Sequence, residues 1–357
     1  MKSFDEQKIL NCGQAIDDLV NIDFHARGVL KSIYQAFLEK VGEPLSTYAA
    51  KGLLEVLKEP GKIVLIGTGF MIKPTLKPET DGPIASALLA RAVSLLGGKP
   101  VIVIEKEGVK ATVAACNAAE LNVCESIEEA LNTPHSVAVE AMPACKEEKE
   151  AKGKMDYFLS YHPAAMVSIE HPGSGDDRKY YSVMGYALDD WVAPIDRLLE
   201  EVRAQGGFTI GVGDAGNEAG MGHSKEAVEE YLPYGELTSA KSSCDAPIIA
   251  SVSDFAVLGL IAAMQVITGK KVLPGLELEE VVVRSTVIAG SLDGCTGRQI
   301  PAIDMIDINY IKSFLHMLDA IVYYTEEFAP TRPFFVDYLR GADIGAPGTY
   351  SGGHGGK

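Results

Sequence analysis

Hydrophobic residues in the first 60 positions recur at the spacing of a helix. Val29, Ile33, Phe37 and Val41 follow one another at intervals of four residues, which keeps them close to one helix face. This pattern predicts an N-terminal helical segment over residues 1–60 that packs on a main domain.

Beyond Pro60 the pattern changes to short apolar runs that alternate with helical stretches. Runs that are apolar on both faces are typical of strands buried within a parallel sheet. The predicted strands are 63–69, 101–105, 136–140, 166–170, 208–213 and 248–254. The predicted helices are 83–96, 109–121, 191–204, 255–268 and 308–328. This alternation indicates an α/β fold over residues 61–340, in which a mostly parallel sheet has helices on both faces in Rossmann-like layers.

The composition narrows the classes of function. The chain has 357 residues, 47% of them hydrophobic, and a net charge of -17. This charge disfavours nucleic acids and anionic membrane surfaces as partners, because both attract clustered Lys and Arg. No apolar run approaches the ~20 residues that span a bilayer, and the polar N-terminus does not resemble a secretory signal.

The cysteines bear on the cellular compartment of the protein, and the C-terminal tail bears on its order. The six cysteines are scattered, with no C-x-x-C pair, so we expect reduced thiols rather than a disulfide framework or a zinc site. Reduced thiols are typical of a cytoplasmic protein. The glycine-rich tail over 341–357 is expected to be flexible. Many α/β enzymes of this size are symmetric dimers, so a homo-oligomer stays open.

Three loops at the ends of predicted strands are rich in polar residues. Open α/β sheets bind ligands beyond the carboxyl ends of their strands, so we expect these loops to meet. The candidate binding residues of the first loop are Gly67, Thr68, Gly69, Lys73, Glu79, Thr80, Asp81 and Gly82. Glycines let the backbone approach a ligand, and the start of the helix 83–96 offers N–H groups to a carboxylate. The alternative is that Thr80 or Asp81 only caps that helix.

The second loop places a carboxylate beside an imidazole. Glu170 and His171 adjoin at the end of the predicted strand 166–170, and a proline and a glycine that fix the turn follow them. Histidine is the side chain best suited to move a proton near neutral pH. The alternative is a hydrogen-bonded loop histidine without a catalytic role.

The third loop, over 211–222, contains a literal G-x-G-x-x-G after a strand. Such a loop can bind a dinucleotide, but here Asp214 lies inside the turn that would receive the phosphates and would repel them. No strand that ends in an acidic residue follows about 20 residues later. Asp214, Asn217 and Glu218 among glycines are more typical of a polar pocket or of a Mg²⁺ or Mn²⁺ site.

A further glycine-rich turn, over 291–298, ends in Arg298. Its guanidinium is suited to clamp a substrate carboxylate, and the alternative is a surface ion pair with a nearby aspartate. Cys295 in the same turn is a poor candidate nucleophile, because no partner base can be assigned to it.

Three strings in these loops carry a resemblance to a known family. They are ETDGP before the Ala- and Leu-rich helix with LARA, the SIEHPG turn, and GVGDAGNEAGMG. Together they resemble the D-glutamate cyclase family, and the similarity runs from about Asp23 to Phe335. The resemblance implies a lyase of amino-acid metabolism that dehydrates D-glutamate to 5-oxo-D-proline. It also implies the stand-alone form of a domain that animals fuse behind a hydratase-like domain.

Ring closure of glutamate implies roles for the loop residues. We expect Asp214 or Glu218 to bind the ammonium and one of them to act as base, with His171 as acid–base partner. Asp81 is a further candidate catalytic residue. Backbone N–H groups of 67–69 and Gly82, helped by Lys73 or Arg298, would hold carboxylate. No organic cofactor is expected. If a divalent cation takes part, its expected ligands are Glu79, Asp81, Asp214 and Glu218.

Two other classes of function stay open. The first is a metal- or nucleotide-dependent enzyme that acts on another small carboxylate or on a phosphorylated substrate. The second is a non-catalytic protein that binds an amino acid. All three hypotheses name a small molecule as the partner.

Overall fold

The computed structural model describes residues 4–73 and 75–327 and shows an α/β fold built on one parallel sheet. Its seven strands lie in the order β5-β6-β4-β1-β7-β8-β9, and every neighbouring pair is parallel. The strands are β1 (Ile63–Thr68), β4 (Lys99–Glu105), β5 (Asn122–Cys124), β6 (Ser136–Met142), β7 (Ala165–Ile169), β8 (Phe208–Gly213) and β9 (Ala246–Ile249). The fold class predicted from the sequence is confirmed.

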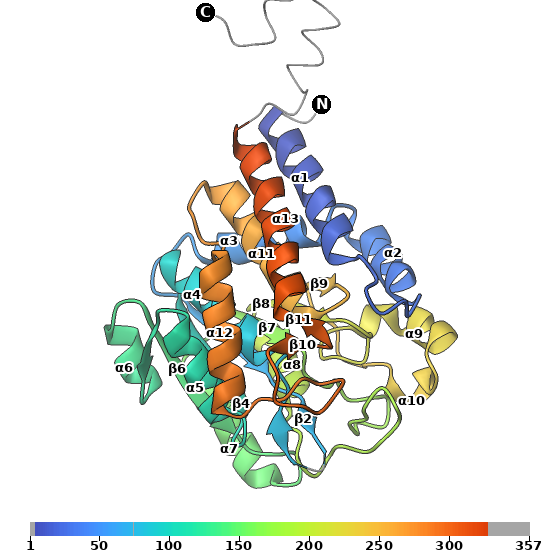
Figure 1. The fold of residues 1–357 in the computed structure, drawn as a ribbon. Coiled ribbons are helices and arrows are strands. Elements are labelled where there is room, and N and C mark those ends of the chain that lie inside the picture. Colours follow the sequence, from blue (N-terminus) through green and yellow to red (C-terminus); the bar gives the residue numbers. More distant parts are fainter. Residues whose placement is uncertain (1–3, 74, 328–357) are drawn as a thin grey trace, which may run out of the picture.

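Helices cover both faces of the sheet (Figure 1). One face packs against α3 (Leu45–Val56), α4 (Pro83–Leu95), α5 (Val109–Ala118) and α11 (Ser253–Thr268). The other face packs against α6 (Ile127–Asn132) and α8 (Ile195–Ala204), and α7 (Glu148–Leu159) contacts α8. Each face therefore has its own hydrophobic cluster, as expected for strands that are apolar on both sides.

Further helices form an outer layer over the α11 face. They are α1 (Phe4–Val20), α12 (Leu276–Ala289) and α13 (Ile308–Glu327), while α2 (Leu30–Val41) packs beside the edge strand β9. Side chains of α1, α3 and the sheet belong to one cluster. Ile33 and Phe37 of α2, two of the positions with the predicted spacing, lie in a cluster with Ile249 of β9.

The two largest differences between predicted and observed boundaries each have a local reason. The predicted strand 248–254 ends at Ile249, and α11 already begins at Ser253, because a side chain from another loop caps its first turn. The predicted helix 191–204 begins only at Ile195, since Pro194 disfavours helical geometry in the residue before it. The predicted tail 341–357 lies outside the described residues.

Small elements complete the fold and matter for the site. Two short hairpins are formed by β2 (Met71–Ile72) with β3 (Lys77–Pro78) and by β10 (Ala302–Ile303) with β11 (Ile306–Asp307). The segment after β8 contains α9 (Lys225–Tyr231) and α10 (Gly235–Thr238). Within the described residues, no helix combines the length and the apolar character needed to cross a bilayer.

Candidate active site at the carboxyl edge of the sheet

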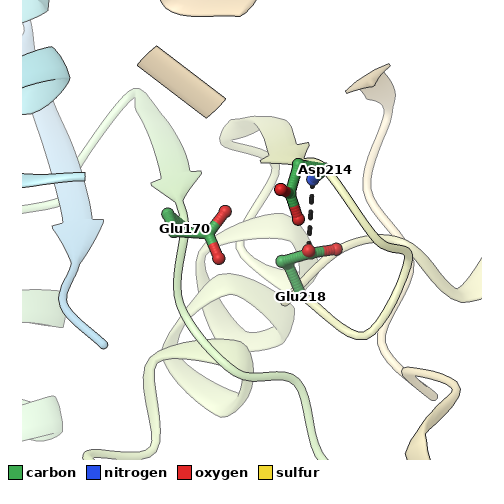
Figure 2. A group of neighbouring side chains, drawn as sticks. All are labelled: Glu170, Asp214 and Glu218. Carbon is green, nitrogen blue, oxygen red and sulfur yellow. Dashed lines mark hydrogen bonds between the residues drawn. The ribbon is translucent and has the colours of Figure 1, made fainter. Parts of the chain in front are cut away.

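The topology itself marks a place for a ligand. The connection from β1 to β4 runs through α4 on one face of the sheet, whereas the connection from β7 to β8 runs through α8 on the other. Neighbouring strands β1 and β7 send their chains to opposite faces, and open α/β sheets bind ligands beyond the carboxyl ends of the strands at such a point. We call this region the crevice. Glu170 at the end of β7 and Asp214 at the end of β8 point toward Glu218 there (Figure 2).

Glu170 is aimed into this crevice by an unusual backbone conformation. Its φ is 41°, in the left-handed region that costs a residue with a side chain about 1–3 kcal/mol. One carboxyl oxygen accepts a hydrogen bond of 2.6 Å from the hydroxyl of Ser253 on α11. Burial, together with Asp214 and Glu218, raises the pKa of Glu170 well above its usual range.

Glu218 is held by the glycine loop that follows β8. Its carboxylate accepts backbone N–H groups from Asp214, Ala215 and Gly216 at 3.1, 2.9 and 2.7 Å. A Cβ on Gly213 would lie 2.3 Å from this carboxylate, so only glycine fits there. Burial and Asp214 raise the pKa of Glu218 to about 7, against the opposing effect of the N–H donors. The donors that a nucleotide phosphate would need are thus already bound to a side chain of the loop.

Asp214 forms an ion pair that the sequence did not predict. Its Oδ2 lies 2.7 Å from Nη2 of Arg27, which also donates to the carbonyl of Ser251 at 2.8 Å. Arg27 lies between α1 and α2, in a turn where the carboxylate of Asp23 accepts the N–H groups of residues 27 and 28. The N-terminal segment therefore supplies a cation to the crevice.

The β10–β11 hairpin brings a further carboxylate. Its two turn residues, Asp304 and Met305, both have positive φ, which is the geometry of a tight two-residue hairpin turn. Burial and Asp214 raise the pKa of Asp304 to about 7, while Arg27 lowers it. Nothing in the strand pattern marks Asp304, because it follows no strand of the main sheet.

Glu79 lies beside Asp304 without a partner of its own. A Cβ on Gly294 would lie 2.3 Å from Oε2 of Glu79 and 3.1 Å from Oδ1 of Asp304, so both carboxylates border the same small space. Glu79 is only 8% exposed, and its carboxylate forms no hydrogen bond or ion pair with the described residues. Burial, Asp304 and Asp81 raise its pKa well above the usual range.

Asp81 caps a helix other than the one that the sequence predicted. Its carboxylate accepts the N–H groups of Ser253 and Asp254 at 3.0 and 2.9 Å, and that of Gly82 at 2.8 Å. It therefore caps the first turn of α11, not of α4, whose N-cap is Gly82 without a side-chain bond. Thr80 donates to the carbonyl of Ala302 and so ties the first loop to the β10–β11 hairpin.

His171 points away from Glu170. Its ring is fully buried, with Nε2 at 2.9 Å from Glu105 and Nδ1 at 3.0 Å from the carbonyl of Pro172. Glu105 ends β4, on the far side of β1, and lines a hollow of about 240 Å³. Both ring nitrogens are thus engaged, which favours a positioning role, and a direct role in proton transfer stays a prediction.

The other predicted binding residues lie in varied surroundings. Gly67 and Thr68 are buried within β1, and Asn217 is buried in the glycine loop. Gly69 has a φ of 121° and approaches Glu105. Lys73 is exposed, with its ammonium 3.6 Å from the centre of the Trp191 ring. Arg298 is exposed and forms no ion pair with the described residues, so the alternative of a local aspartate partner is not realised.

Comparisons with known proteins agree with the loops. The family described as "D-glutamate cyclase-like, C-terminal" matches residues 16–319. The chain belongs to this family. A human relative, "D-glutamate cyclase, mitochondrial", is 29% identical over 216 residues. That alignment covers 57% of this chain and 33% of the human protein, so the chain spans about a third of that relative's length.

Charge balance determines what the crevice of this D-glutamate cyclase-like protein can do. Six carboxyl groups meet there, and Arg27 is the cation that pairs with them in the described part of the chain. The six are Glu79, Asp81, Glu170, Asp214, Glu218 and Asp304. An acidic site of this kind favours cationic ligands over anionic ones, and groups with a pKa near 7 can both give and take protons at neutral pH. The pKa of Cys295 is raised to about 12 by burial and by Asp304, so its thiol stays protonated.

A second pair of acids lies deeper in this D-glutamate cyclase-like fold. Asp254 in the first turn of α11 and Glu279 in the first turn of α12 are fully buried, and none of their four carboxyl oxygens has a hydrogen-bond partner within the described residues. Burial raises the pKa of Glu279 to about 8, and burial together with Glu279 raises that of Asp254 well above its usual range.

Proposed function

We propose that the protein is a D-glutamate cyclase-like lyase that dehydrates D-glutamate to 5-oxo-D-proline. The observation that carries the proposal is the crevice itself, in which Glu218 and Asp304 both have a pKa of about 7 beside a guanidinium. Membership of the D-glutamate cyclase-like family supports the choice of substrate.

The reaction joins two ends of one molecule. The amine attacks the γ-carboxyl carbon, so that a C–N bond forms and a C–O bond breaks. Two of the three ammonium protons leave with the departing oxygen as water. The protein therefore needs one group that accepts a proton from the ammonium and one that donates a proton to the oxygen. Holding the two ends together supplies much of the rate.

The acids of the crevice match these needs. We assign the first proton transfer to Asp304, because its pKa of about 7 suits a base at neutral pH and it lies at the rim of the crevice. Glu218 is the second group of this kind, and the loop N–H groups fix its orientation. Asp214 would receive the ammonium through the oxygen that does not face Arg27.

Arg27 would hold a carboxylate of the substrate. Its Nη2 is engaged by Asp214 and Ser251, and the side chain is 31% exposed, so the remaining guanidinium donors are accessible to a ligand. This assignment replaces the one made for Lys73 and Arg298, which are exposed and have no contact with the acids of the crevice among the described residues.

A direct assay tests the proposal. Purified protein is incubated with D-glutamate or L-glutamate, with and without EDTA, and 5-oxoproline is followed by chiral chromatography. We expect product from D-glutamate and a loss of at least a hundredfold in kcat for Asp304→Asn, with no change for the exposed Glu226→Gln. Absence of product from D-glutamate between pH 6 and 9 would reject the function. Tight binding without turnover would instead identify an amino-acid-binding protein.

A further inference from the structure

Glu170, Asp214 and Glu218 place one carboxyl oxygen each within 4.8 Å of one another, from the ends of two strands and the loop that follows (Figure 2). An octahedral Mg²⁺ or Mn²⁺ with oxygens at about 2.1 Å separates its ligand atoms by about 3.0–4.2 Å. The three side chains therefore reach one such ion with movements of about 1 Å.

Glu79 is a second and independent observation that points to a ligand. Glu79 as a whole residue is more than nine-tenths buried, and its carboxylate has no partner among the described residues. It faces Asp304, Asp81 and Asp214, all of the same sign. A buried carboxylate without a partner is costly, and neither the protein fold nor the loop N–H groups offset that cost here. A cation bound in the crevice would offset this cost.

We propose that Glu170, Asp214 and Glu218 bind one divalent cation of the Mg²⁺ or Mn²⁺ class, and that the unpartnered carboxylate of Glu79 beside them strengthens the binding through its charge. Asp81, which the sequence suggested as a ligand, is not part of this group of three, and its carboxylate caps the first turn of α11. Glu218 also accepts three backbone N–H groups, all from its own loop, which leaves about one lone-pair site of its carboxylate for the ion. Hard oxygen donors select this class of ion over thiolate-binding metals.

A bound ion would also offset the negative charge of the substrate; this part of the argument rests on the proposed function. Glutamate carries two carboxylates, while the acids of the crevice have a single guanidinium paired with them in the described residues. An ion held between Glu170 and Asp214 would offset the repulsion and polarise the γ-carboxyl group for attack.

Metal binding can be tested without the reaction. EDTA-treated full-length protein is titrated with Mn²⁺, and free Mn²⁺ is followed by electron paramagnetic resonance. We expect saturation at one equivalent per chain and competition by Mg²⁺. Glu79→Gln should weaken the affinity at least tenfold, and this variant should fold, because its carboxylate holds no other group. Glu170→Gln should weaken it at least as much.

The control is Glu226→Gln, which removes one charge from the exposed surface and should leave the affinity unchanged. Absence of binding at millimolar Mn²⁺ would overturn the proposal. So would wild-type affinity in folded Glu79→Gln and Glu170→Gln, since the ion would then bind elsewhere. Mn²⁺ binding without turnover of D-glutamate would retain the metal site and reject only the function, whereas EDTA-resistant turnover without Mn²⁺ binding would do the reverse.

Discussion

Replacing Glu279 by glutamine should make the protein more stable at alkaline pH. Glu279 is fully buried on α12, both its oxygens lack a hydrogen-bond partner within the described residues, and its nearest titratable neighbour is the equally buried Asp254. Glutamine has nearly the same shape but cannot ionise. The substitution therefore removes the cost of a buried charge without leaving a cavity.

The size of the effect follows from the pKa. The carboxyl group of Glu279 titrates at about 8 in the folded protein and near 4.5 when unfolded. Between these values the folded state keeps a proton that the unfolded chain has lost, so stability falls by about 1.4 kcal/mol per pH unit as pH rises. Above pH 8 the accumulated cost is on the order of 5 kcal/mol. Because the unpaired amide of glutamine costs about 1–3 kcal/mol, we expect a net gain of about 2–4 kcal/mol.

Urea denaturation at pH 5 and pH 9 measures the difference. At pH 5 the ionisation cost in wild type is below about 1 kcal/mol, so the unpaired amide should leave Glu279→Gln about 0–2 kcal/mol less stable than wild type. At pH 9 the variant should show the full gain. Glu277→Gln, an exposed change in the same helical turn, should stay within about 0.5 kcal/mol of wild type at both values. An equal gain at pH 5 and pH 9, or a loss at pH 9, would refute the reasoning.

Substitutions at three positions of the site, with Gly61 as a control outside it, give further tests. Asp81→Ala should lower the free energy of unfolding by about 2–4 kcal/mol, because three backbone N–H groups lose their acceptor; a urea-measured loss below 1 kcal/mol would contradict the capping role. At Gly216 the backbone φ is 89°, and the Cβ of an alanine would lie 2.4 Å from the side chain of Val228. Gly216→Ala should therefore lower the free energy of unfolding by about 2–4 kcal/mol. At Gly61 the φ is 83°, but an added Cβ would contact nothing. Gly61→Ala should therefore lower the free energy of unfolding by only about 1 kcal/mol, the backbone strain alone. Arg27→Ala should raise the KM for D-glutamate at least tenfold, with partial recovery in Arg27→Lys, and an unchanged KM would remove Arg27 from the binding site.

Strand ends allowed most of the acids to be found from the sequence alone. Glu79, Asp81, Asp214 and Glu218 all follow strands that are apolar on both faces, and parallel strands end at the same edge of a sheet. Arg27 could not be predicted in this way, because it lies between two N-terminal helices and follows no strand of the sheet. Its approach to Asp214 depends on how α1 and α2 pack, which no local pattern specifies.

The direction in which a side chain points is the other feature of the site that the sequence pattern does not predict. Glu170 and His171 are adjacent, and the sequence suggested that they act together. The positive φ of Glu170 turns the chain so that one side chain meets Ser253 and the other meets Glu105. Asp81 illustrates the same limit, since its position before a helix predicted a cap but not which helix it would cap.

The glycine loop after β8 neutralises its own N–H groups with the carboxylate of Glu218. A loop of this kind mimics the occupied state of a phosphate-binding turn while carrying the anion covalently. A nucleotide phosphate could therefore reach these N–H groups only by displacing a carboxylate that belongs to the same chain.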